Sequence, residues 1–228
     1  EALARWERPR LALGAGAFVT LAERAGLATP LALAVAGTAI EALAAVRRVL
    51  PLRLSFNVPL AVLLRADLPS RLGALAAQHG LRPHDVMLEL TESTTVRDTA
   101  LLRRALQRLD GAGFRVLLDD LGLDDSRAPL LGLPFAGVKL DRSLIAALPN
   151  ERRARAQVER LVRRSHAEGR AVVAEGVTDP LLWRAAAAAG CDLAQGFGVG
   201  RPIPPEAMPA WISAWSGAGG GGRARQVA

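Results

Sequence analysis

The sequence contains a series of short apolar runs that each end in acidic or amide side chains. Four of them end at Asn57, Glu89, Asp120 and Glu175, and segments with helical patterns separate them. Short buried runs that alternate with helices are typical of parallel strands in an α/β protein. Because the carboxyl ends of parallel strands meet at one edge, we expect these polar side chains to gather there, on the catalytic face if the sheet closes into a barrel.

Strand and helix patterns alternate at least five times, which predicts βα units around a parallel sheet. The expected strands cover residues 52–58, 86–91, 114–120, 136–141 and 171–176. The expected helices cover residues 16–27, 31–50, 69–79, 97–111, 151–168, 180–189 and 205–215. A chain of 228 residues that is 50% apolar suits one barrel-sized domain. We assign residues 1–215 to this domain and the Gly- and Arg-rich residues 216–228 to a flexible tail.

Lys139 is the only lysine beside 28 arginines, and it lies in the expected strand 136–141. A compact ammonium retained in such a chain indicates a position where a planar guanidinium does not serve. Lys139 is therefore the first candidate site residue, and the chance survival of one lysine is the alternative.

The net charge of +7 raises the question of nucleic-acid binding. The arginines are scattered along the expected helices, a pattern typical of solvated helix faces. The chain has no Tyr and only 4% aromatic residues, which leaves little basis for a platform that stacks bases. We therefore expect no long nucleic acid as a partner, and an anionic small ligand remains compatible.

Cys191 is the only cysteine, which excludes an intramolecular disulfide and a multi-cysteine metal site and fits a cytoplasmic location. The most apolar stretch, residues 30–46, contains Glu41 and is predicted to be a buried helix rather than a membrane span. We expect that an upstream part of a full-length protein can still carry a membrane anchor or a sensor.

A set of motifs in this order resembles the EAL domain family over residues 1 to about 204. They are Glu1-Ala2-Leu3 with Arg5-Trp6, Asn57, Glu89-Leu90-Thr91-Glu92-Ser93, Asp119-Asp120-Leu121-Gly122, Lys139-Leu140-Asp141, Ala174-Glu175-Gly176-Val177 and Gln195-Gly196-Phe197. The resemblance implies a TIM-barrel-like (β/α)8 fold whose N-terminal strand or strands are missing from this chain. It also implies metal-dependent hydrolysis of cyclic di-GMP to the linear dinucleotide pGpG in bacterial second-messenger signalling.

The resemblance also assigns expected roles to individual residues. The implied metal ligands are Glu1, Asn57, Glu89, Asp119, which would bridge two ions, and Asp120, with Asp141 at an ion or its waters. The implied catalytic residues are Lys139 and Glu175, the implied substrate-binding residues are Arg5 for a phosphate and Gln195, and Glu92 would support the loop after the aspartate pair. Oxygen ligands of this kind suit two Mg²⁺ or Mn²⁺ ions.

The residue types also fit phosphodiester cleavage on chemical grounds. Two divalent ions roughly 3.5–4 Å apart provide a nucleophile near neutral pH and neutralise charge on the phosphate. Lys139 would hold the attacking water or offset developing negative charge, and Glu175 would accept the proton. The adjacent acids Asp119 and Asp120 would repel each other without a cation.

Simpler interpretations remain open for the other residues. Glu1 can be a frayed terminus, Asn57 can satisfy a turn and Glu89 can cap the next element. Arg5 can pair with a neighbouring acid, and Gln195 can be a structural amide.

Three departures from the family pattern limit the expected activity; the altered loop favours an alternative function, whereas the retained metal and base positions favour the enzyme. The loop after the aspartate pair, residues 121–127, differs from the usual Phe-Gly-Thr-Gly-Tyr-Ser-Ser, and one residue is missing between the pair and Lys139. In addition, Thr178 replaces a glutamate of the family pattern. Strand residues that precede the Glu-Ala-Leu motif in active members are not part of this chain, which would leave an open sheet edge. The alternative is a catalytically degenerate domain that acts as a cyclic di-GMP receptor or a protein-interaction module. A homodimer and an upstream sensory or GGDEF-type domain are expected in either case.

Overall fold

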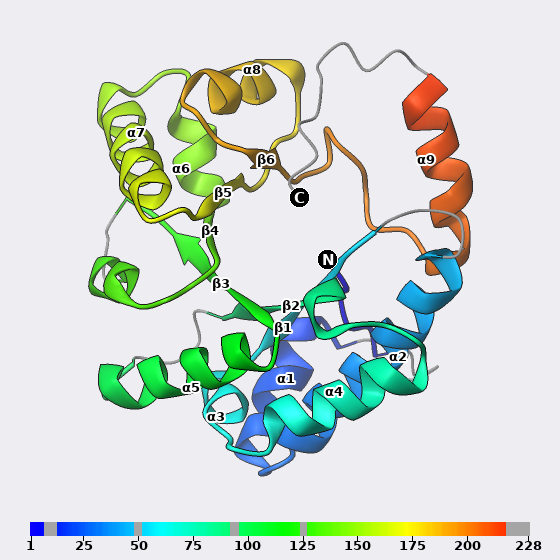
Figure 1. Cartoon of the computed structure of the whole chain (residues 1–228). Helices are drawn as coiled ribbons and strands as arrows, with labels where there is room; N and C mark the ends of the chain where they lie inside the picture. Colours follow the sequence, from blue (N-terminus) through cyan, green and yellow to red (C-terminus); the bar gives the residue numbers. More distant parts are fainter. Residues whose placement is uncertain (7–12, 48–51, 92–95, 124–126, 218–228) are drawn as a thin grey trace.

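The computed structural model describes residues 1–6, 13–47, 52–91, 96–123 and 127–217. Within these residues, parallel strands form one six-stranded curled sheet in sequence order (Figure 1). The strands are β1 (Leu54–Val58), β2 (Val86–Leu90), β3 (Arg115–Leu121), β4 (Gly137–Leu140), β5 (Ala171–Ala174) and β6 (Leu193–Ala194). Parallel neighbours need crossover connections, so helices lie between successive strands. The molecule is of the α/β class and forms a partial (β/α) barrel.

Most helices lie along the outer side of the sheet, whereas the carboxyl-terminal helix lies apart from the strands (Figure 1). They are α1 (Ala15–Arg24), α2 (Ala28–Arg47), α3 (Leu60–Leu63), α4 (Leu68–Gln78), α5 (Thr99–Gly111), α6 (Arg142–Ala147), α7 (Arg152–Ala167), α8 (Pro180–Ala188) and α9 (Met208–Gly217). Short 3₁₀ helices lie at η1 (Pro83–Asp85), η2 (Ala128–Gly132) and η3 (Pro205–Ala207). One continuous apolar core joins helices α2 to α8 to the strands.

The helix boundaries follow from local chemistry. Asp98 caps α5, and its carboxylate accepts a 2.8 Å hydrogen bond from the backbone N–H of Leu101. Gly113 follows that helix with φ of +88°, a conformation that favours glycine. Helix α7 buries Val158 and Leu161 and exposes its arginines, as expected for an amphipathic helix.

The expected strands and long helices agree with the observed ones except at their boundaries. Two short helices, α3 and α6, and the strand β6 within residues 192–196 were not among the expected elements. The helix expected at 31–50 is α2, which begins at Ala28; residues 48–51 lie outside the described residues. The tail expected at 216–228 falls almost entirely outside them as well and stays a prediction.

Helix α2 is the one helix of the described residues that is long and apolar enough to cross a membrane by length and composition, with a mean hydropathy of 1.7. In the structure it contributes Ala36, Ile40 and Leu43 to the core. One face of the apolar stretch therefore packs against the core, while only 28% of its most apolar window is buried, less than the sequence predicted.

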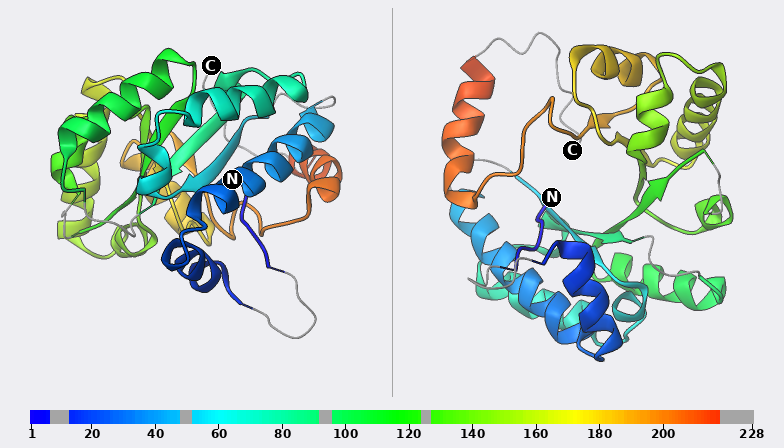
Figure 2. Two further views of the ribbon diagram at one scale, coloured as in Figure 1. Left: turned by 90° about the horizontal axis from the view of Figure 1, so that it is seen from below. Right: turned by 180° about the vertical axis from the view of Figure 1, so that it is seen from behind.

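The amino-terminal residues lie beside β1, at one edge of the sheet (Figure 2). Ala2 forms a parallel bridge with Phe56, and its N–H donates a 2.7 Å hydrogen bond to the carbonyl of Ser55. Because Ala2 is paired with β1, the preceding residue Glu1 is held near the ends of the strands.

Candidate active site

The carboxyl ends of the strands turn their polar side chains toward the inside of the curled sheet. Side chains on a strand alternate between its two faces, so every second residue of each strand points to the inner face of the curled sheet. Asn57 lies on β1, Glu89 on β2, Asp119 on β3 and Lys139 on β4, and Glu175 directly follows β5. Asn57 and Glu89 are partners in the β1–β2 register. Residues far apart in the sequence thus meet at one place.

The ammonium of Lys139 lies among four acidic side chains. The side chain is 2% exposed, and Nζ lies 2.6 Å from Glu175, 2.8 Å from Glu89 and 3.4 Å from both Asp119 and Glu1. A compact ammonium with three donors can serve carboxylates on several sides, whereas a guanidinium is larger and planar. The geometry gives a physical reason for a lysine at this position.

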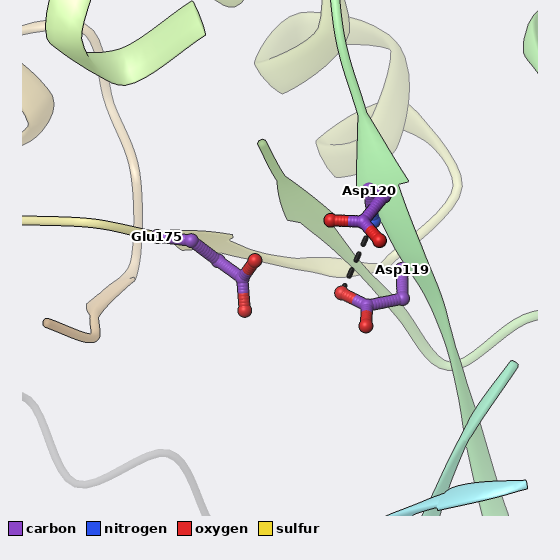
Figure 3. A group of neighbouring side chains, drawn as sticks. All are labelled: Asp119, Asp120 and Glu175. Carbon is purple, nitrogen blue, oxygen red and sulfur yellow. Dashed lines mark hydrogen bonds between the residues drawn. The ribbon is translucent and has the colours of Figure 1, made fainter. Parts of the chain in front are cut away.

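Asp119, Asp120 and Glu175 form a second group of carboxylates. Oxygen atoms of all three lie within 4.8 Å of one another, and the side chains converge (Figure 3). In a regular strand the consecutive residues Asp119 and Asp120 would point to opposite faces. Here the β3–β4 register shifts between Leu118 and Leu121, and Asp120 has φ of +56°. This irregularity at the end of β3 brings both carboxylates to one side.

The donor set of this group fits a hard divalent cation. Carboxylate oxygens are the ligands that Mg²⁺ and Mn²⁺ prefer. Asp119 and Glu175 also face Lys139, but a single ammonium cannot neutralise these acids together with Asp120, Glu1 and Glu89. A cation between Asp119, Asp120 and Glu175 would offset the remaining negative charge.

Glu1 is held by amides from two distant parts of the chain. Asn57 donates a 2.7 Å hydrogen bond to one carboxylate oxygen of Glu1, and Gln195 donates a 2.6 Å hydrogen bond to the other. Lys139 approaches the same oxygen as Gln195. The side chain of Glu1 is 9% exposed, so the terminus is not frayed in the structure.

The acids do not share one electrostatic environment. Burial and then Asp119 raise the pKa of Glu175 to about 7, although Lys139 opposes the shift. Burial also raises the pKa of Glu89 and of Asp119. Burial disfavours the ionised form of Glu1 too, but Lys139 and the Gln195 hydrogen bond outweigh it and lower its pKa.

The pKa of Lys139 is raised, because the attraction of the surrounding carboxylates exceeds the cost of burying its charge. The lysine is therefore a permanent cation near neutral pH.

Two of the expected site residues, Arg5 and Asp141, do not join this cluster in the structure. Arg5 is exposed, and its guanidinium donates to the carbonyl of the adjacent Ala4 at 3.1 Å. Asp141 caps α6 by accepting hydrogen bonds from the hydroxyl of Ser143 and, at 2.9 Å, from its N–H. Glu92 lies outside the described residues. The roles expected for these residues stay predictions.

Two further polar residues contact the cluster and were not singled out from the sequence. Ser55 is buried and donates a hydrogen bond to Glu89. It precedes Asn57 by two positions on β1, and this spacing was the signal that both side chains share the inner face. Arg127 donates to backbone carbonyls, including that of Asp119, and its sequence position alone gave no such signal.

Comparison with known proteins identifies the family of the chain. The sequence matches the model of the EAL domain family over residues 1–202. The chain belongs to the EAL domain family.

Two relatives come from Pseudomonas aeruginosa. The cyclic di-GMP phosphodiesterase PA2567 is 31% identical over 215 residues, which cover 93% of this chain and 37% of that protein. The bifunctional diguanylate cyclase/cyclic di-GMP phosphodiesterase MucR is 31% identical over 220 residues, covering 93% of this chain and 32% of MucR. The chain thus spans about a third of the length of these two relatives.

A solved structure gives a similar result. The PaMucR phosphodiesterase in complex with c-di-GMP superimposes with a TM-score of 0.79 and 29% sequence identity. The match covers 90% of this chain and 84% of that one. The similarity therefore extends over almost the whole of both domains.

Proposed function

We propose that this chain is a metal-dependent phosphodiesterase that hydrolyses cyclic di-GMP to the linear dinucleotide pGpG. The observation that carries the proposal is the convergence of Asp119, Asp120 and Glu175 beside the buried ammonium of Lys139. The relatives named as cyclic di-GMP phosphodiesterases support the choice of substrate.

Within this proposal, the metal ligands are the oxygen-bearing side chains that the family resemblance implies. Asp119 and Asp120 would hold Mg²⁺ or Mn²⁺, with Glu1, Asn57 and Glu89 completing the sites for two ions. Such ions make a water molecule nucleophilic near neutral pH and polarise the phosphate. Asp141 is proposed to reach the ions or their waters only after leaving its role as a helix cap.

The protein side chains then supply proton transfer and charge stabilisation. Water would attack phosphorus, the P–O bond to one ribose oxygen would break, and the carboxylate of Glu175 would accept the proton that the water loses. The leaving ribose oxygen would take up a proton from solvent and become the free hydroxyl of the linear product. Lys139, 2.6 Å from that carboxylate, orients it and offsets negative charge that develops on the phosphate. Gln195 and Asn57 keep Glu1 in one orientation. Arg5 would turn from Ala4 toward a phosphate of the bound substrate.

The test is incubation of the purified protein with cyclic di-GMP and Mg²⁺ or Mn²⁺, with and without chelator, followed by chromatographic separation of the nucleotides. We expect linear dinucleotide only with metal. The Glu175→Ala variant should lose turnover and keep nucleotide binding, whereas Glu159→Ala, an exposed acid on α7 paired with Arg163, should behave as wild type. Turnover in Glu175→Ala would refute the role of Glu175.

A degenerate receptor is the second candidate, and the divergent residues 121–127 favour it. Thr178, which replaces a family glutamate, hydrogen-bonds to Asp179 next to it, at the start of α8. A receptor would bind cyclic di-GMP and leave it intact with metal present. The chromatographic experiment separates the two candidates directly.

The setting of the domain is also a proposal. The relatives are about three times as long as the matched region, and MucR is named as bifunctional. We place the chain in a cytoplasmic signalling protein with an upstream sensory or GGDEF-type domain, acting as a homodimer. Sedimentation of the full-length protein would test the dimer.

A further inference from the structure

Arg127 connects the carboxyl ends of two neighbouring strands. One terminal nitrogen of its guanidinium donates a 2.6 Å hydrogen bond to the carbonyl of Asp119, at the end of β3. The other donates to the carbonyls of Leu90, at 3.3 Å, and Thr91, at 3.4 Å, where β2 ends. The side chain is half-buried, and it contacts the acidic cluster through the backbone carbonyl of Asp119.

The regular sheet does not fix this part of β3. The register pairs of β2 and β3 end at Leu90 and Leu118, and the β3–β4 register shifts between Leu118 and Leu121. Asp119 and Asp120 lie within this interruption, where Asp120 adopts its left-handed conformation. Carbonyl groups that leave a ladder near the interior need other donors. Arg127 supplies such donors for Asp119 and for the end of β2.

We infer that Arg127 is a positioning residue that holds the Asp119–Asp120 turn against the end of β2, so that the aspartate carboxylates keep the spacing needed for a divalent ion. The inference rests on the proposed function for its catalytic consequence, although its effect on metal binding can be measured separately. Arg127 lies in the segment where this sequence departs from the family pattern. A residue of the divergent segment, Arg127, would thereby order the aspartate pair.

The guanidinium is suited to this task because it presents several donors in one rigid plane. It bonds to carbonyls on two strands through separate nitrogens. The ammonium of a lysine is a single point on a flexible stem, and glutamine carries only two donors on one atom. We therefore expect Arg127→Lys to retain part of the function and Arg127→Gln to retain little.

The experiment measures Mn²⁺ binding by electron paramagnetic resonance on wild type, Arg127→Gln and Arg127→Lys, at a temperature where all are folded. Arg108→Gln is the matched control, because Arg108 also donates to two backbone carbonyls, those of Leu64 and Arg65, outside the cluster. Loss of a residue that supports metal ligands typically weakens metal affinity by about 10–100-fold. We expect this loss in Arg127→Gln, a smaller loss in Arg127→Lys and wild-type affinity in Arg108→Gln.

Chemical rescue distinguishes positioning from general stability. Adding methylguanidinium to Arg127→Ala should restore part of the Mn²⁺ affinity and leave Arg108→Ala unchanged. Wild-type Mn²⁺ affinity in Arg127→Gln, or no Mn²⁺ binding by wild type, would overturn the inference. If wild type binds Mn²⁺ but leaves cyclic di-GMP intact, the proposed function fails while a weakened Arg127→Gln still supports positioning.

Discussion

The side-chain amide of Gln195 donates a 2.6 Å hydrogen bond to the carboxylate of Glu1, across a separation of 194 positions in the chain. Gln195 directly follows β6, and Glu1 directly precedes the residue that bridges to β1. These strands are the two edges of the six-stranded sheet. The contact therefore links the edges of the curled sheet at the site itself.

Replacement of Gln195 by alanine tests this link. Without the amide, the carboxylate of Glu1 loses the partner that fixes its second oxygen, and we expect kcat/KM to fall by about 10–100-fold. The fold should persist, because the hydrogen bond contributes only about 1 kcal/mol. Steady-state kinetics and circular dichroism measure both effects. The control is Gln78→Ala, an exposed amide at the end of α4; equal losses in both variants would contradict the assignment.

Replacement of Lys139 by arginine tests the requirement for a compact cation. The position is 2% exposed and surrounded by carboxylates, so the broader guanidinium must displace at least one of them. We expect kcat to fall by at least about 100-fold, the usual effect of losing one electrostatic donor in an active site. Rates near wild type would show that only the charge matters.

Lys139→Met should instead damage stability. It removes the cation that lies among these acids in the described part of the chain and leaves their buried negative charge uncompensated. Breaking a buried ion pair in this way costs about 3–5 kcal/mol. Urea unfolding of the metal-free protein measures the change, and a variant as stable as wild type would contradict the geometry.

Asp120→Asn tests the metal site by a stability measurement without substrate. Asparagine tolerates the φ of +56° found at this position, so the change removes charge and spares the backbone. Mn²⁺ at 100-fold its Kd adds about 2.7 kcal/mol, or about 5–10 °C in Tm for a chain of this size. We expect wild type to show this rise and Asp120→Asn to lose most of it. Asp110→Asn, an exposed acid paired with Arg115, is the control and should keep the rise.

Asp85 provides a test of pH-dependent stability away from the cluster. Its side chain is 1% exposed, contacts Arg47 and accepts a 2.9 Å hydrogen bond from the N–H of Arg82. Burial alone would raise its pKa, but Arg47 and this N–H outweigh burial and hold the pKa below its usual value. Because the folded-state pKa of Asp85 lies below its unfolded-state pKa of about 3.9, the ionised carboxylate stabilises the folded protein at pH values above about 3.9. This contribution to stability is lost as the pH falls through the folded-state pKa.

We expect Asp85→Asn to lower the free energy of unfolding at pH 7 by about 1–3 kcal/mol. The difference from wild type should shrink as the pH falls below about 4. Urea titrations between pH 3 and 7 measure it, with Asp67→Asn as the control because Asp67 forms an exposed pair with Arg65. A difference that grows toward low pH would contradict the stated sign.

Much of the fold could be predicted from the sequence, because strand and helix formation follow from local patterning. Apolar runs predicted β1 to β5, and only the two-residue β6 was missed because such a strand has almost no pattern. The polar residues at the strand ends were also visible as candidates. Asp141, which the sequence placed at the ion site, lies outside the acidic cluster in the structure. Its carboxylate accepts a hydrogen bond from Ser143 and caps a helix.

The sequence by itself determined the order of the elements and the family, through short-range patterns and spaced motifs. Only the tertiary structure decided which side chains meet. The irregular end of β3 turns Asp119 and Asp120 to one side, and the curvature of the sheet brings Gln195 to Glu1. The tertiary structure also places Arg127 where it donates hydrogen bonds to carbonyls of both β2 and β3. Such contacts depend on backbone geometry between residues far apart in the chain, and no local pattern encodes it.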